Sequence, residues 1–83
     1  MDIWCCIQGR QKSKLKVENL NEDTDDLKKM YFKDCDLNIY QTLYTAYIGN
    51  KEIKPETKIE TFISEINSEN PLIFKIESII IFL

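Results

Sequence analysis

The sequence predicts a small α+β fold in which a mixed sheet of four or five strands packs one face on a helix. Residues 12–18 alternate Lys with Ser, Leu and Val, which is the period of a half-buried strand. Residues 23–34 carry apolar side chains at helical spacing behind a capping aspartate. Short β-branched and aromatic runs follow. With 83 residues, the chain has room for one domain and one small core.

The first two elements are predicted to form an antiparallel hairpin. Residues 3–8 read as a strand without a breaker, and residues 9–11 supply a turn before the alternating stretch 12–18. If the lysines of that stretch face solvent, the matching register leaves Trp4 and Cys6 pointing outward. The residues expected to face the core from this hairpin are Ile3, Cys5, Ile7, Leu15 and Val17.

A helix is predicted over residues 23–34. Asp23 is a good N-cap, and Asp26 follows three residues later in a capping-box position. Acidic residues in the first turn suit the positive end of the helix dipole. One helical face carries Leu27, Met30, Tyr31 and Cys35, and the residues expected outside that face are Lys28, Lys29 and Lys33.

A second strand pair is predicted after the helix. Residues 42–48 are rich in Thr, Tyr, Leu and Ile, and Gly49-Asn50 turns the chain into a short strand at 51–54. Thr57 and Glu60 form a second capping-box pattern at the start of a short helix.

Residues 72–77 read as the last strand, followed by the apolar tail 78–83. The chain is therefore expected to form one domain over 1–83, with its folded core at about 2–77. The remaining core residues expected are Ile48, Ile53, Phe62, Leu72, Phe74 and Ile76.

Composition argues against catalysis and against a metal or cofactor site. The chain has no histidine, which removes His general bases, Ser-His and Cys-His pairs and the commonest metal ligand. Its three cysteines, Cys5, Cys6 and Cys35, lack a C-x-x-C spacing and fit a reduced, intracellular environment. A lysine near Cys6 would lower the pKa of that thiol, but no base or orienting group accompanies it. We expect a non-catalytic binding module.

The charge of the chain limits the class of partner it can bind, and its N-terminal sequence bears on where in the cell it works. The net charge of −3 does not favour nucleic acid. Residues 8–17 nevertheless carry only basic charges, and residues 18–26 only acidic ones, so a charged protein partner is plausible at either stretch. Asp2 follows Met1 and the next apolar run is short, so no classical signal peptide is expected. No stretch is long and apolar enough for a membrane span.

The order of elements resembles the ubiquitin-like β-grasp family over about residues 2–77. The matching stretches are Leu15-Lys16-Val17-Glu18, Asp23-Thr24-Asp25-Asp26-Leu27-Lys28, Ala46-Tyr47-Ile48-Gly49-Asn50-Lys51-Glu52-Ile53 and Thr57 to Glu60. The resemblance implies a mixed sheet gripping one helix. A conjugated modifier would need a C-terminal Gly-Gly, whereas this sequence ends in Ile81-Phe82-Leu83.

Within that family the sequence is similar to the N-terminal header domain of Crinkler-type effectors. The similarity is carried by Trp4-Cys5-Cys6-Ile7-Gln8-Gly9, by Asp26-Leu27-Lys28-Lys29, and by Pro55 ahead of Ile59, Glu60 and Phe62. The family's Leu-Phe-Leu-Ala-Lys motif is replaced by Leu43-Tyr44-Thr45-Ala46-Tyr47, and the 83 residues contain no effector domain. The resemblance implies a secreted effector domain that acts in host cells after leaderless secretion.

Partner-binding candidates follow from the basic stretch, the outward tryptophan and the positions that match ubiquitin's recognition face. They are Trp4, Arg10, Lys12, Lys14, Lys16, Tyr47 and Lys75. Each has a plainer reading: the lysines protect a sheet edge, Trp4 packs on lysine stems and Tyr47 is an ordinary surface aromatic. Alternative functions are a Ras-association or adaptor module binding through the basic strand, and a regulatory domain of a larger enzyme. A homodimer through strand edges or the tail is also open.

Overall fold

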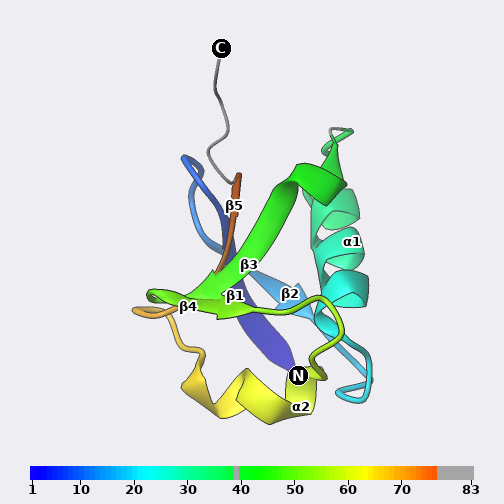
Figure 1. Ribbon diagram of the computed structural model, residues 1–83, viewed down its shortest axis with the longest axis vertical. Helices are drawn as coiled ribbons and strands as arrows, with labels where there is room; N and C mark the ends of the chain where they lie inside the picture. Colours follow the sequence, from blue (N-terminus) through cyan, green and yellow to red (C-terminus); the bar gives the residue numbers. More distant parts are fainter. Residues whose placement is uncertain (39, 77–83) are drawn as a thin grey trace.

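The computed structural model describes residues 1–38 and 40–76, which form one mixed five-stranded sheet with a long helix against it (Figure 1). The strand order is β2-β1-β5-β3-β4, a β-grasp-like α+β arrangement as predicted. The elements are β1 (Asp2–Ile7), β2 (Ser13–Lys16), α1 (Thr24–Asp34), η1 (Gln41–Leu43), β3 (Tyr44–Ile48), β4 (Lys51–Ile53), α2 (Ile59–Phe62), η2 (Ile63–Glu65) and β5 (Leu72–Ile76). The predictions made for the tail 78–83 lie outside the described residues.

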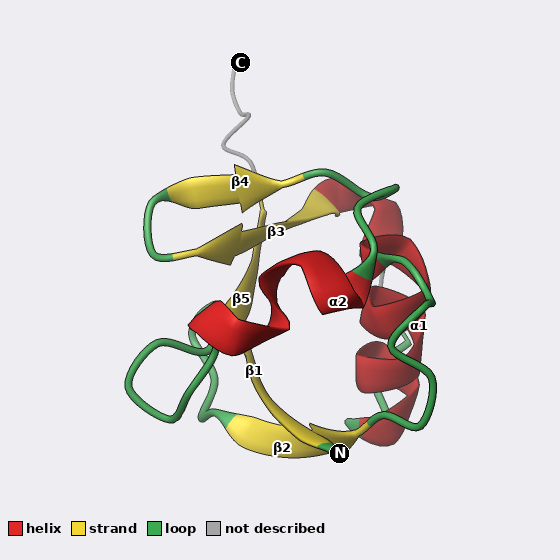
Figure 2. Ribbon diagram, turned by 90° about the horizontal axis from the view of Figure 1, so that it is seen from below, coloured by secondary structure: helices red, strands yellow, loops and turns green. Residues whose placement is uncertain are grey.

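The hairpin of β1 and β2 has the predicted register. Ile3 pairs with Leu15 and Trp4 with Lys14 in an antiparallel ladder. On its other side β1 pairs in parallel with β5, so β1 and β5 form the centre of the sheet. Figure 2 shows α1 lying along one side of the molecule, and Figure 1 shows α2 at the lower end, below the sheet. Because side chains alternate along each strand, one face of the sheet is buried against α1.

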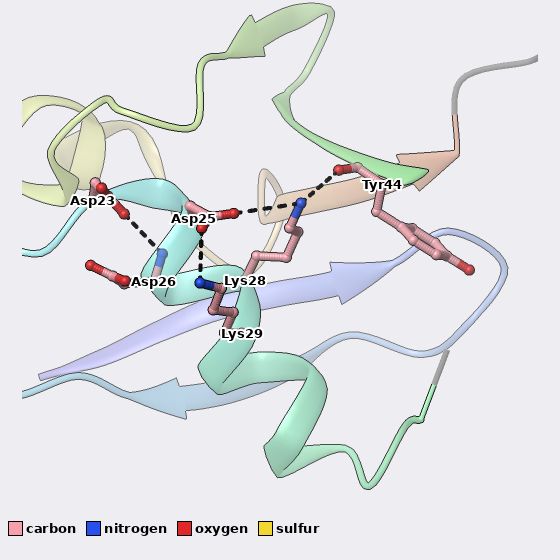
Figure 3. Close-up of polar contacts among 6 residues, drawn as sticks. All are labelled: Asp23, Asp25, Asp26, Lys28, Lys29 and Tyr44. Carbon is pink, nitrogen blue, oxygen red and sulfur yellow. Dashed lines mark hydrogen bonds and ion pairs between the residues drawn. The ribbon is translucent and has the colours of Figure 1, made fainter. Parts of the chain in front are cut away.

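The N-terminus of α1 is held by side chains that the sequence identifies (Figure 3). The Asp23 carboxylate accepts from the backbone N–H of Asp26 at 2.9 Å, which confirms the predicted N-cap. Lys28 departs from its expected place outside the apolar face, since it is only 9% exposed. Its stem is buried, and its ammonium donates to the Tyr44 carbonyl at 3.1 Å and lies 3.9 Å from Asp25. Lys28 thus ties α1 to the start of β3.

The core contains most of the predicted residues, with corrections on α1 and β5. Phe32 is fully buried and packs edge-on against Tyr44 and Phe74, with ring centroids 5.1 and 5.8 Å apart. Met30 is only half-buried, and Ile76 is 46% exposed rather than part of the core. The buried apolar side chains among the described residues are Ile3, Cys5, Ile7, Leu15, Val17, Leu27, Tyr31, Phe32, Ala46, Ile48, Ile53, Ile59, Phe62, Leu72 and Phe74.

Two local predictions about the second half of the chain are wrong. The stretch 42–48 is extended only from Tyr44, because residues 41–43 form the 3-10 turn η1. The capping box at Thr57 does not form: Lys58 is the N-cap of α2, without a side-chain cap. The Thr57 carbonyl instead accepts from the backbone N–H and the hydroxyl of Thr24, which joins this loop to α1. Across residues 1–38 and 40–76, neither helix has the length and apolar character needed to cross a membrane.

Candidate functional site

The sheet face turned away from α1, called the outer face below, collects most of the predicted binding residues. Directly opposed residues on neighbouring strands point to the same side of a sheet. The register therefore places Lys14 beside Trp4, Cys6 beside Ile73, Ile73 beside Tyr47, and Tyr47 beside Glu52. The described members of the outer face are Asp2, Trp4, Cys6, Lys14, Lys16, Thr45, Tyr47, Glu52, Ile73 and Lys75.

Trp4 is the centre of a first cluster on this face. Its half-buried ring has the Lys14 ammonium 5.2 Å and the Lys12 ammonium 5.7 Å from the centroid. Lys12 also donates to the Ser68 carbonyl, so it links the hairpin to the loop before β5. Each cation–π contact of this kind is worth about 0.5–1 kcal/mol at an exposed site. The structure thus shows Trp4 packed on lysines, as the plainer reading of the sequence expects.

Tyr47 and Lys75 form a second cluster. The Lys75 ammonium lies 4.7 Å from the centre of the Tyr47 ring, and Tyr47 is half-buried on β3. Glu52 on β4 stands directly opposite Tyr47, so this end of the outer face has mixed charge. Cys6 and Ile73 lie between the two clusters in the ladder. The outer face therefore carries two aromatic rings, each with an ammonium group close to it, on adjoining parts of one sheet.

Arg10 and Lys16 lie apart from these clusters. Arg10 is exposed in the turn after β1, where Gly9 adopts a φ of +83°. Its backbone carbonyl accepts from the Cys6 thiol at 3.1 Å. Lys16 is exposed on β2, directly opposite Asp2 on β1. The structure thus brings together Trp4, Lys12 and Lys14, and separately Tyr47 and Lys75.

The cysteines do not show the features of an activated nucleophile. Burial raises the pKa of the Cys6 thiol despite the opposing effect of Lys12, so the lowered pKa expected beside the basic strand is wrong. Burial also raises the pKa of Cys5, which is inaccessible inside the core. Within the described part of the chain, no three His, Cys, Asp or Glu side chains are placed to hold a metal ion.

A groove beside Trp4 adds residues that sequence reasoning missed. It has a volume of about 410 Å³ and lies between the start of β1 and the turn after α2. Its apolar walls include Met1, Trp4, Ile63 and Ile66. The signal in the sequence is the helical spacing of four apolar residues from Ile59 to Ile66. A helix as short as α2 cannot bury all four side chains. Ile59 and Phe62 enter the core, and the other two line the groove.

Comparison of the chain with protein-family models and with curated proteins finds no match in either. The chemistry of the outer face and of the groove beside it therefore carries the functional conclusion.

Proposed function

We propose that this chain is a non-catalytic protein-interaction domain of ubiquitin-like type that binds its partner through the outer face of the sheet. The observation that supports this most is the pairing of Trp4 with Lys12 and Lys14, and of Tyr47 with Lys75, on one face. Aromatic side chains that are already held in place lose little freedom on binding, and they are frequent among the residues that dominate interface energies.

The charges on this face favour an acidic protein partner. Lys12, Lys14 and Lys75 lie beside apolar ring surface, where a carboxylate brought by a partner is partly shielded from water. Nucleic acid is disfavoured, since the chain as a whole carries a net charge of −3. The same lysines also oppose sheet pairing with the wrong chain, so both roles are compatible.

The cellular setting that we propose follows from the resemblance to Crinkler-type header domains. In that setting the chain is the N-terminal domain of an effector that works inside host cells. A cytoplasmic or nuclear location suits three free thiols, which stay reduced there. Self-association through the exposed edges of β2 or β4 is a further possibility within this proposal.

A Ras-association or adaptor role is the second candidate, and one observation favours it. Strand β2 is at the edge of the sheet and presents Lys14 and Lys16 to solvent. An edge strand of this kind can extend a partner's sheet while its cations meet the partner's acids. This candidate predicts salt-sensitive binding to a GTP-loaded small GTPase that Lys14→Glu and Lys16→Glu abolish. Binding that survives both substitutions would rule it out.

The main proposal is tested by charge reversal on two surfaces. Lys14→Glu with Lys75→Glu changes the outer face, while Lys54→Glu with Lys58→Glu makes the same charge change elsewhere on the exposed surface. Proteins captured by the wild-type chain from lysate are identified, purified and titrated calorimetrically against all three chains. We expect the outer-face variant to bind at least about tenfold more weakly and the control to bind normally. Equal affinity for both double variants would refute the proposal.

A further inference from the structure

The groove beside Trp4 has the size and lining of a site for one large apolar side chain. Its volume of about 410 Å³ falls within the roughly 300–1,000 Å³ typical of ligand sites. Ile63 and Ile66 are both half-buried, so each keeps apolar surface that the core does not cover. The backbone around the groove is firmly tied, because the Met1 ammonium donates to the Val17 carbonyl at 3.0 Å. The groove is therefore built on strand β1 and the 3-10 turn η2, with Met1 and Ile66 at their ends.

The charges around the groove are positive on the Trp4 side. Trp4 lines the groove and also carries the ammonium groups of Lys12 and Lys14 near its ring. Among residues 1–38 and 40–76, the ion pairs of lysine involve Lys28, Lys29 and Lys51, and neither Lys12 nor Lys14 has an acidic partner.

Each acidic group near the groove has a lysine close to it. Asp2 lines the groove, and the strand register places Lys16 directly opposite it on β2. Glu65, which follows Ser64 at the groove wall, is bound by Lys51 at 2.7 Å. The charge left for a partner to neutralise is thus that of Lys12 and Lys14. Charge complementarity selects an acidic occupant.

We propose that the groove beside Trp4 binds an extended acidic segment of a partner protein, with one large apolar side chain inserted between Trp4 and Ile66. The inference rests on the proposed function and specifies the partner's chemistry. The two ammonium groups lie 5–6 Å from the ring centre, and an extended chain advances about 3.3 Å per residue. The recognised segment therefore carries an acidic residue one or two positions from its apolar anchor.

The experiment uses random twelve-residue peptides displayed on phage, selected against the full chain. Enriched peptides are synthesised and titrated while the fluorescence of Trp4, the chain's single tryptophan, and the ¹H–¹⁵N spectrum are followed. We expect sequences that pair Leu, Ile, Met, Phe or Trp with nearby Asp or Glu. Replacing the anchor by Ala should weaken binding by about tenfold or more. Binding should also weaken as salt is raised.

Two variants of the chain and one control complete the test. Ile66→Ser removes one groove wall and Lys14→Glu reverses one of the two charges, and each should weaken peptide binding about tenfold or more. Leu43→Ser, an exposed leucine on η1, should leave binding unchanged. Because Lys14 is exposed, Lys14→Glu is expected to fold. It therefore tests the proposal even if Ile66→Ser does not fold.

Several results would overturn the inference. These are the absence of any enriched peptide, enrichment of basic or anchor-free sequences, and peptide binding that leaves Trp4 and Ile66 signals unmoved. Concentration-dependent changes of the same signals without peptide would show that a second copy of the chain is the occupant instead. Peptides that shift only Tyr47 and Lys75 would refute the groove while leaving the proposed function standing.

Discussion

The Tyr31 hydroxyl offers a sharp test of how α1 is joined to the hairpin. It donates to the Cys5 carbonyl at 3.1 Å and lies 2.7 Å from the Ser13 hydroxyl, although the ring is only 1% exposed. Tyr31→Phe keeps the ring and its contact with Phe74 but leaves the Cys5 carbonyl without this partner. An unsatisfied buried polar group costs about 1–3 kcal/mol. We expect the free energy of unfolding at pH 7 to fall by that amount.

The pH dependence supplies a second, independent part of this prediction. Burial raises the pKa of Tyr31 to about 12, partly offset by the hydrogen bond with Ser13. Between pH 10 and 12 the unfolded chain loses the tyrosine proton while the folded chain keeps it, so stability falls as the pH rises through this window. The loss amounts to about 2–3 kcal/mol. Cys5, whose pKa burial also raises, acts in the same direction from about pH 9.

Urea unfolding followed by circular dichroism at pH 7, 9, 10 and 11 measures both effects. The wild-type chain should lose stability steeply above pH 10, and Tyr31→Phe should start lower but lose less over the same interval. Cys5 titrates in both chains, so the difference between the two curves reports mainly on the Tyr31 hydroxyl and its neighbours. Parallel curves for the two chains would refute the account of Tyr31.

Three further predictions concern packing, capping and the first turn. Phe32→Ala should destabilise the chain by about 3–5 kcal/mol in urea unfolding, whereas Leu43→Ala should change stability by less than about 0.5 kcal/mol; similar losses would contradict the packing described for Phe32. Asp23→Ala should cost about 1 kcal/mol, and Thr57→Ala less, because only Asp23 caps a helix with its side chain; the reverse order would be incompatible with the observed caps. Gly9→Ala should lower the free energy of unfolding by about 1–2 kcal/mol, because alanine is strained at the φ of +83° that Gly9 adopts. An unchanged urea midpoint would count against that backbone conformation.

The regular patterns in the sequence predict the first half of the fold well. Alternation over residues 12–18 sets the hairpin register, because a slip by one residue would expose Leu15 and bury lysines. Asp23 fixes the start of α1 because few residues can accept from the free N–H groups of the first turn.

The errors arise where tertiary contacts override the local pattern. Phe32 and Lys28, which lies one turn earlier in α1, are both buried. Because Lys28 is charged, the spacing of these two residues does not indicate a buried helical face in the sequence. The Tyr44 carbonyl, distant in sequence, and the Asp25 carboxylate together make burial of that lysine acceptable. Ile76 continues the alternation of β5 but lies beyond the last pairing with β1, so no core reaches it.

Tertiary contacts also limit how much of the outer face and its groove could be predicted from the sequence. Hairpin register alone brings Lys14 to Trp4, but the contact between Tyr47 and Lys75 depends on β5 pairing with β3, which no local pattern specifies. The groove depends on where the turn after α2 lies relative to the start of β1. The sequence therefore indicates only that Ile63 and Ile66 are apolar residues that the short helix cannot bury, and it does not predict the groove that they line.

Site-specific photocrosslinking measures most directly whether the outer face meets a partner. A photoreactive phenylalanine analogue is placed at Tyr47 on the outer face, or at Tyr40, which is 79% exposed ahead of η1. We expect a discrete crosslinked protein only from position 47, suppressed by excess wild-type chain and not by the Lys14→Glu, Lys75→Glu double variant. Equal crosslinking from both positions, or a product from position 40 alone, would contradict recognition through the outer face.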